Sequence, residues 1–200
     1  MRKWSYSLQS KNEIRKALLA KRRAVTAEQR MAAGQTARQM LVTNSLFYTS
    51  QHIACYLGQE DEFDCTPIIQ EIWRLGKKCY LPVLSSQKTQ GLEFVVYHPG
   101  DRLRLNRYKI FEPERGDGLA AEKLDLVMVP LVAFDAQGHR VGMGGGYYDR
   151  TFSFRREGVC SKPYLLGLGY ELQRVAEVPG QSWDVLLDGV LTEEKINSVA

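Results

Sequence analysis

The chain has 200 residues, of which 44% are hydrophobic and 25% are charged, and its formal net charge is +4. These proportions are those of an ordinary globular protein with enough chain for one substantial core. No apolar run reaches the roughly 18 residues of a membrane span, and the first residues lack the apolar segment of a signal peptide. We therefore expect a cytoplasmic protein without a membrane partner. Residues 1–9 are expected to be a flexible lead-in, followed by a single α/β catalytic domain over residues 10–200.

The cysteines and histidines show no metal-ligand spacing. Cys55, Cys65, Cys79 and Cys160 form no Cys-x-x-Cys pair, so a structural zinc site is not expected. Cys55 and Cys79 lie in apolar stretches, which is typical of buried thiols in a reducing compartment. His139 lies near a glycine-rich segment, where a ligand contact and a solvated turn residue are both open interpretations.

Basic residues concentrate in residues 11–30, with a smaller group in residues 102–109. No aromatic-interleaved RNA motif or helix-turn-helix signature accompanies them, so a nucleic-acid partner is not expected. A small polyanionic ligand would explain the charge, and so would solvated helix faces.

The first predicted element is a helix over residues 11–23, because Ile14 and Leu18 follow helical spacing. Lys11 and Arg15 are four residues apart, so they lie on one face and can act on the same anion. The alternative is a basic stripe that is simply solvated.

A βαβ unit follows. The capping box at residues 26–29 (TAEQ) begins a second helix that runs to about residue 42. Residues 51–57 are a strand candidate, Asp64 or Thr66 can cap the next helix, and residues 78–83 form another strand. A strand, a helix and a strand within about thirty residues predict a parallel pair with a right-handed crossover.

The rest of the chain continues the alternation. We expect a polar loop at 85–91, strands at 92–97, 124–129, 164–169 and 188–192, a largely loop region up to residue 122, and a helix at 147–157. The predicted fold is a single α/β domain with a mostly parallel open sheet flanked by helices. It is Rossmann-like and related to the sheets of sugar-phosphate isomerases and CoA-transferases.

The most informative segment is residues 140–150 (RVGMGGGYYDR), which follows an apolar run. Glycine has no side chain to pack, but it permits positive φ and a close approach of a ligand to the backbone. A strand, a glycine-rich turn and a helix together point backbone N–H groups at an anion. We interpret the segment as the phosphate-binding loop of a nucleotide-using enzyme, although it matches neither the Walker A nor the dinucleotide motif. A flexible turn without a ligand is the alternative.

Two loops are expected to meet. Ligands of open α/β sheets bind at the carboxyl ends of the strands. The acidic loop at residues 58–63 and the glycine loop both follow predicted strands, so we expect one cleft with an acidic and a phosphate-binding side.

A series of short blocks runs through residues 10–195. In order they are Lys11 with Arg15, Tyr56-Leu57 with Glu62, Gly76-Lys77 with Pro82, Ile110 with Glu112-Pro113, Asp125 to Pro130, Phe134-Asp135 with Gly138 and Arg140, Gly142 to Asp149, Leu166 to Gln173, Asp184-Val185 with Asp188, and Thr192-Glu193. In these blocks the chain resembles the 5-formyltetrahydrofolate cyclo-ligases, also called methenyltetrahydrofolate synthetases.

The resemblance implies a reaction. ATP phosphorylates the formyl oxygen of 5-formyltetrahydrofolate, N10 attacks the activated carbon, and 5,10-methenyltetrahydrofolate forms with release of ADP and phosphate. The protein then has mainly to position the γ-phosphate and to neutralise charge, with ATP and Mg²⁺ as its cofactors. A monomer is expected, and the basic excess favours polyglutamylated folates.

The resemblance also implies the site residues. The catalytic residues would be Arg140, Tyr148 and Asp149, and the metal ligands would be Asp149 and Asp188. ATP would contact Lys11, Asn12, Glu13, Ile14, Arg15, Arg140, Val141, Gly142, Met143, Gly144, Gly145, Gly146, Tyr147 and Tyr148. The folate substrate would contact Tyr56, Leu57, Glu62, Met143, Gly144, Gly145, Gly146 and Tyr147. From the residues alone, Asp149 could instead be a helix N-cap and Glu62 an exposed loop acid.

Two positions depart from the family pattern. Gly145 stands where members often carry lysine, and Trp183 stands where a histidine is expected. By analogy of fold, an enzyme acting on a sugar phosphate or a CoA ester on a similar open α/β sheet is one alternative, since related sheets carry other chemistries. A non-catalytic nucleotide- or folate-binding regulator is another, and the absent loop lysine is the feature in its favour.

Overall fold

The computed structural model describes residues 10–85, 91–114, 116–157 and 162–199. Its main sheet contains β1 (His52–Ala54), β2 (Lys78–Leu84), β3 (Leu92–Val96), β6 (Gly118–Leu119), β7 (Leu126–Pro130), β10 (Tyr164–Leu168), β11 (Gly189–Leu191) and β12 (Ile196–Ser198). They lie in the order β12-β11-β10-β7-β1-β2-β3-β6. The four central pairings, from β11 to β2, are parallel, and the outer three are antiparallel. The mostly parallel sheet is thus confirmed, with antiparallel edges.

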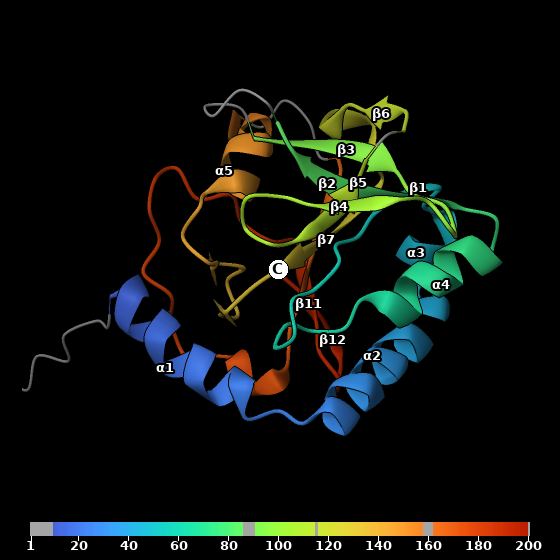
Figure 1. Ribbon diagram of the computed structural model, residues 1–200. Helices are drawn as coiled ribbons and strands as arrows, with labels where there is room; N and C mark the ends of the chain where they lie inside the picture. The colour runs from blue at the N-terminus through green and yellow to red at the C-terminus, as the bar shows by residue number, and fades with distance from the viewer. Residues whose placement is uncertain (1–9, 86–90, 115, 158–161, 200) are drawn as a thin grey trace, which may run out of the picture.

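Helices cover both faces of this sheet. They are α1 (Lys11–Arg23), α2 (Ala27–Val42), α3 (Ser45–Thr49), α4 (Thr66–Arg74) and α5 (Tyr147–Thr151), with 3₁₀ turns at Ala121–Lys123, Ser153–Glu157 and Glu171–Gln173. Figure 1 shows α2 and α4 side by side below the sheet and α5 on the opposite side. None of the helices in the part of the chain described here is long and apolar enough to cross a membrane.

Strand β7 shows how the two cores form. Leu126 and Met128 pack in one hydrophobic cluster with α2 and α4, whereas Val127 and Val129 pack in the cluster that holds Phe152, the residue after α5. All four side chains are buried. Because successive side chains of a strand point to opposite faces, an unbroken apolar run is what a strand covered on both faces requires.

Helix α1 packs on its own small cluster. Ser10 and Glu13 form a capping box at its start, and Ile14 and Leu18 are buried against the segments that flank the glycine loop. The helix predicted from their spacing is therefore confirmed. The next buried position is Arg22, which is only 2% exposed.

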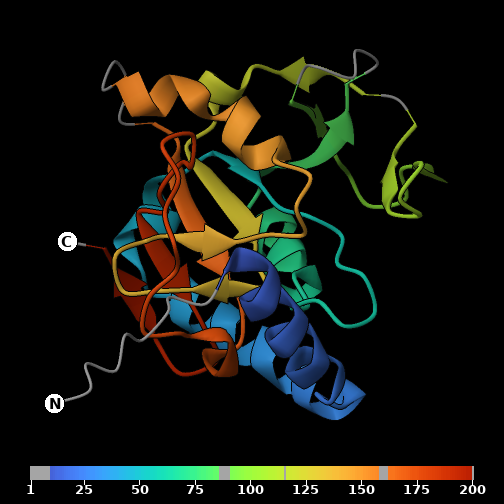
Figure 2. The same cartoon turned by 90° about the vertical axis from the view of Figure 1, so that its left-hand side faces the viewer.

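The βαβ prediction is confirmed, because β1 and β2 pair in parallel around α4. The expected loop between residues 97 and 122 is wrong in part: it contains β6 and a separate hairpin of β4 (Leu103–Leu105) and β5 (Phe111–Pro113). Figure 2 shows this yellow-green hairpin projecting from the main sheet. The helix expected to reach residue 157 ends at Thr151 and continues as a 3₁₀ turn.

Several expectations fall outside the described residues, namely the lead-in at 1–9, most of the polar loop at 85–91, and Cys160. The other cysteines can be assessed. Cys55, Cys65 and Cys79 are free and buried, which agrees with the interpretation of Cys55 and Cys79 as core thiols.

A small hairpin carries the chain into the glycine loop. It consists of β8 (Ala133–Phe134) and β9 (Arg140–Val141). The buried carboxylate of Asp135 accepts hydrogen bonds from the N–H groups of Gln137, His139 and Val178 at 2.9–3.0 Å, and Nδ1 of His139 lies 3.1 Å from it. His139 therefore helps to fix this turn, and it is not among the residues that line the main cavity.

Candidate active site

A cavity of about 350 Å³ lies at the carboxyl ends of the central strands. Its walls come from the first half of α1, the loop after β1, the end of β2, the segment after β7, the β4–β5 hairpin and the glycine loop. The predicted meeting of the acidic loop and the glycine loop is confirmed, because both line this one cavity.

The glycine loop takes backbone conformations that need glycine. Gly144 has φ of +96° and Gly146 has φ of +63°. Residues other than glycine rarely adopt such φ angles, because their Cβ atom clashes with the backbone. Arg15 also approaches closely: its Nε donates to the carbonyl oxygen of Gly142 at 2.7 Å. The loop is thus held open toward the cavity and tied to α1.

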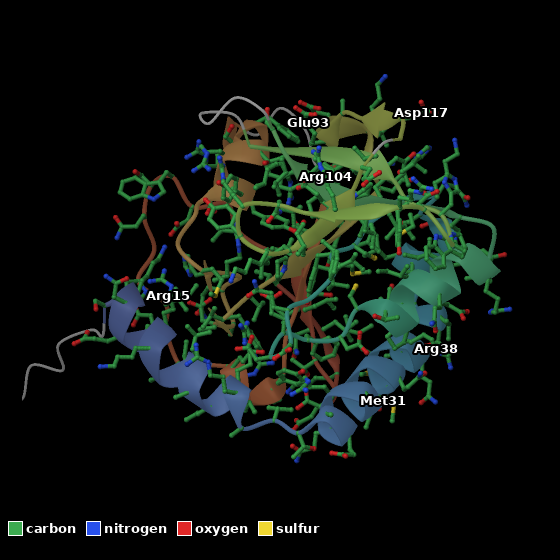
Figure 3. The ribbon with its side chains drawn as sticks, viewed as in Figure 1. Arg15, Met31, Arg38, Glu93, Arg104 and Asp117 are labelled. Atoms are coloured by element: carbon green, nitrogen blue, oxygen red, sulfur yellow. The ribbon has the colours of Figure 1, made fainter. Side chains whose placement is uncertain are left out.

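Cations surround this end of the cavity. Lys11 and Arg15 line it from α1, and Figure 3 marks Arg15 on the N-terminal half of that helix. Arg140 lines it from β9, where its Nη2 lies 2.6 Å from Oδ1 of Asp149. Its Nη1 donates to the carbonyl oxygen of Val185. Lys11 pairs with Asp184 at 2.5 Å. Three cations and a glycine loop around one space are groups that can bind a polyanion.

The apolar end of the cavity is the part of its wall that includes Tyr56, Leu57 and the acid Glu62. Glu62 has a side chain that is 11% exposed, and its Oε2 accepts a hydrogen bond from the N–H of Gln59 at 2.9 Å. Burial raises the pKa of Glu62, opposed by that hydrogen bond and by the charge of Arg22. Tyr56 and Leu57 lie beside it on the cavity wall. Glu62 is therefore a largely buried acid that lines the cavity, and the interpretation as an exposed loop acid is wrong.

Two tyrosines follow the glycines and have different surroundings. Tyr148 stacks on Phe152 at 6.2 Å between ring centroids, and burial raises its pKa, so its phenol stays neutral. The Tyr147 hydroxyl lies 2.8 Å from that of Tyr108 and accepts a hydrogen bond from Arg107 at 2.7 Å. These contacts lower the pKa of Tyr147, and the hydrogen bond with Tyr108 has the largest effect. The β4–β5 hairpin is thus joined to the glycine loop through Tyr147.

Most of the expected site residues lie around the cavity. Those that line it are Lys11, Arg15, Tyr56, Leu57, Glu62, Arg140, Gly142, Met143, Gly144, Gly145, Gly146, Tyr147, Tyr148 and Asp149. Four expected ATP contacts do not line it. Ile14 and Val141 are buried in the cluster under α1, Glu13 caps that helix, and Asn12 accepts a hydrogen bond from Arg15.

Asp188, one of the two expected metal ligands, does not line the cavity. Its two carboxylate oxygens accept hydrogen bonds from Arg155 at 2.7 and 2.8 Å, and the N–H of Leu165 donates to one of them at 2.7 Å. Asp184 lines the cavity instead, together with Asp149. The next residue, Val185, donates its N–H to Oδ1 of Asp149 at 3.1 Å, so the segment before β11 brings Asp184 to this wall.

Sequence reasoning also missed part of the lining. The hairpin contributes Asn106, Tyr108, Ile110 and Phe111, and the segment before β11 contributes Trp183. The block Ile110 to Pro113 was a usable signal, because it matched the family inside a region otherwise expected to be loop. No such signal marked Tyr108.

The fold and cavity together define a class of protein, an α/β enzyme with one cavity lined by a glycine-rich loop, cations and apolar residues. A profile of the 5-formyltetrahydrofolate cyclo-ligase family matches residues 7–193. The chain belongs to this family, so the resemblance seen in the sequence is confirmed.

Individual members of this family are similar to the chain over most of its length. The 5-formyltetrahydrofolate cyclo-ligase of Escherichia coli K12 is 39% identical over 178 residues, which cover 88% of this chain and 96% of the relative. The corresponding protein of Haemophilus influenzae is 34% identical over 186 residues, covering 92% and 97%. The NMR structure of Aquifex aeolicus 5,10-methenyltetrahydrofolate synthetase has a TM-score of 0.80 and 29% identity, covering 94% of this chain and 92% of that one.

Proposed function

We propose that the chain catalyses the ATP-dependent cyclisation of 5-formyltetrahydrofolate to 5,10-methenyltetrahydrofolate, with release of ADP and phosphate. One observation carries the proposal beyond family membership. A cationic glycine-loop end, with Lys11, Arg15 and Arg140, and an apolar end, with the buried acid Glu62, face the same cavity. A phosphate donor and an uncharged ring system can therefore meet there.

The triphosphate is proposed to lie against the glycine loop. Lys11, Arg15 and Arg140 supply positive charge from two sides, and the backbone at Gly144 can be approached closely because it carries no Cβ. Arg150 supports the loop at the position of the missing lysine, since its Nη1 donates to the carbonyl oxygen of Gly145 at 2.9 Å.

The proposed reaction has two steps, and these residues handle the charge that moves in them. The formyl oxygen attacks the γ-phosphorus and ADP leaves. N10 then attacks the formyl carbon and loses its proton to solvent, and phosphate leaves with the electrons of the C–O bond. Arg140 and Lys11 neutralise the charge that moves onto the phosphoryl oxygens. Glu62, when ionised, accepts hydrogen bonds from N–H groups of the folate ring, while Tyr148 stays neutral beside the reacting centre.

The residues present also fit Mg²⁺. Asp149 and Asp184 are two carboxylates on the cavity wall, and Mg²⁺ in nucleotide sites is usually held by one or two carboxylates with phosphate oxygens and water. Among the described residues, no group of three His, Cys, Asp or Glu side chains could hold a metal without such additional ligands. When bound, the ion would reduce the negative charge on the γ-phosphate. We propose Asp184 in place of Asp188 as the partner of Asp149.

Two finer points belong to the same proposal. The enzyme is proposed to act as a monomer, because the described residues of one chain bring together the glycine loop, the three cations and Glu62 around one cavity. A preference for polyglutamylated folate is supported by Arg107 and Lys109 on the hairpin at the cavity edge; Arg107 bonds to the lining residue Tyr147. Equal KM values for mono- and polyglutamate substrates would remove that preference.

The direct test mixes the purified protein with 5-formyltetrahydrofolate, ATP and Mg²⁺ and follows the near-ultraviolet absorbance of the methenyl product. We expect growth that requires ATP and is strongly reduced in Arg140→Gln. ATP binding without product formation would reject the folate reaction and point to another substrate. Retention of both ligands without turnover would identify a binding module.

A further inference from the structure

The strongest unexplained feature is a buried cation behind the cavity. Arg22, on the last turn of α1, is 2% exposed. Its Nε and Nη2 donate to Oδ2 of Asp61 at 3.2 and 3.1 Å, and its Nη1 donates to the carbonyl oxygen of Leu131 at 3.4 Å. Burying a guanidinium is costly even when it is paired, so a buried pair is weak evidence for a purely stabilising role.

The groups around Arg22 belong to the wall of the apolar end. Nη1 of Arg22 lies 3.9 Å from Oε1 of Glu62, and Glu62 and Leu131 both line the cavity. The other oxygen of Glu62, Oε2, is held by the N–H of Gln59 at 2.9 Å. The carboxylate is therefore held on one side by the backbone of its own loop and faces the guanidinium on the other.

The position of Arg22 on α1 links the two ends of the site. Arg15 reaches the glycine loop from the same helix, seven residues earlier, which is about 10 Å along the axis. Ile14 and Leu18 anchor the helix between these points. One rigid element thus presents a cation to the anion end and a second cation, from behind, to the acid of the apolar end.

We propose that Arg22 is a positioning residue for Glu62: it holds the acidic loop through Asp61 and directs an ionised Glu62 carboxylate into the cavity to bind the folate ring. This inference rests on the proposed function, in which Glu62 contacts the folate. The charge balance supports it, because burial raises the pKa of Glu62 and the charge of Arg22 opposes that rise. The other ionisable groups near Glu62 are Tyr56, Asp61, Tyr148 and Tyr170, whose hydroxyl donates to the Glu62 carbonyl oxygen. None of them supplies positive charge.

The first test compares Arg22→Gln with Arg23→Gln, its exposed neighbour on α1. We expect Arg22→Gln to raise the KM for 5-formyltetrahydrofolate by about tenfold or more, while the KM for ATP changes less than about twofold. Arg23→Gln should change neither KM. A purely structural Arg22 would lower the melting temperature and leave the folate KM of the folded protein unchanged, and that result would overturn the proposal.

The second test is a double-mutant cycle with Glu62→Gln. If Arg22 acts through Glu62, the double variant has the same folate KM as Glu62→Gln alone, because the partner is already lost. Independent, multiplicative increases would overturn the proposal. Failure of the wild-type protein to form the methenyl product would instead reject the proposed function itself.

Arg22→Lys covers the case in which Arg22→Gln does not fold. Lysine keeps the charge but lacks the planar fork that reaches Asp61 and Leu131 together. We expect a rise of about threefold in the folate KM with an unchanged ATP KM. Equal rises in both KM values, or a rise in neither, would contradict the role of Arg22.

Discussion

The ammonium group of Lys11 lies 2.5 Å from Oδ2 of Asp184, although the two residues are 173 positions apart. Their side chains are 23% and 14% exposed. A second pair, between Arg140 and Asp149 at 2.6 Å, lies on the wall of the same cavity. Each pair joins a proposed phosphate-binding cation to a proposed metal-binding carboxylate. On binding of ATP with Mg²⁺, the two cations would therefore turn from these carboxylates to the phosphates, and the carboxylates would turn to the metal ion.

The first prediction concerns the proposed metal pair, Asp149 and Asp184. Asp184→Asn should reduce the affinity for Mg²⁺ by about 10- to 100-fold and lower kcat, because an amide oxygen is a weaker ligand for a hard cation. Asp149→Asn should act in the same direction. The measurement is the Mg²⁺ concentration that gives half-maximal rate.

Asp188→Asn is the matched control for the metal prediction. It removes a carboxylate that Arg155 holds away from the cavity, so it should lower the melting temperature and leave the Mg²⁺ requirement unchanged. A normal Mg²⁺ requirement in Asp184→Asn, or a raised one in Asp188→Asn, would count against Asp184 as the ligand.

The second prediction concerns the shape of the glycine loop. Gly144→Ala should raise the KM for ATP by about tenfold, since alanine at φ of +96° is strained and shifts the loop. Gly100→Ala is the control, because Gly100 has a similar φ of +88° in an exposed turn. Both variants should lose about 1–2 kcal/mol of stability, and only Gly144→Ala should lose ATP affinity. Equal KM values for ATP in the two variants would show that the glycine loop does not bind the nucleotide.

The third prediction is a pH dependence. Burial raises the pKa of Glu62 above its ordinary 4.5, so this carboxyl takes up its proton at a higher pH than an exposed one. The ionised form binds the folate ring, and the folate KM should therefore rise as the pH falls through this raised pKa. Measuring KM from about pH 5 to 8 tests it. In Glu62→Gln the rise in folate KM at low pH should be absent. A rise that persists in this variant would come from the titration of another group.

The fourth prediction concerns stability. Asp125 accepts the N–H groups of Gln51 and His52 and pairs with Lys162, each at 2.9 Å. Burial acts to raise its pKa, but the hydrogen bonds from His52 and Lys162 outweigh it and lower the pKa from 3.8 to about 2. The depressed pKa contributes about 2 kcal/mol above pH 3.8, and this stability is lost as the pH falls toward 2.

Asp125→Asn tests the stability prediction by denaturant unfolding. The variant should be about 2 kcal/mol less stable than wild type near neutral pH, and the difference should shrink below pH 3.8. A difference that stays the same at low pH would show that the amide disturbs packing and that charge is not the cause.

Local patterns carried the prediction of most of the fold. The run at Leu126–Pro130 is apolar at every position because β7 is covered on both faces, and Ile14 and Leu18 repeat at helical spacing because one side of α1 is buried. The glycine loop could be recognised for a similar reason: its composition makes sense only for backbone conformations such as that of Gly144.

The β4–β5 hairpin could not be predicted in this way. Its strands have three residues each, and Leu105 and Phe111 remain more than half exposed. Without a buried face there is no alternation of apolar and polar residues to detect. Its place over the cavity depends on contacts such as that between Tyr108 and Tyr147.

The sequence alone was enough for the sheet and the glycine loop, because backbone propensity and burial produce regular patterns among neighbouring residues. The family followed from a resemblance in short blocks spread over the chain. The tertiary structure decided which charges meet. It selected Asp184 over Asp188 for the cavity and set Arg22 behind Glu62. Ion pairs between residues far apart in the sequence produce no repeating sequence pattern, since their geometry depends on how the elements pack against one another.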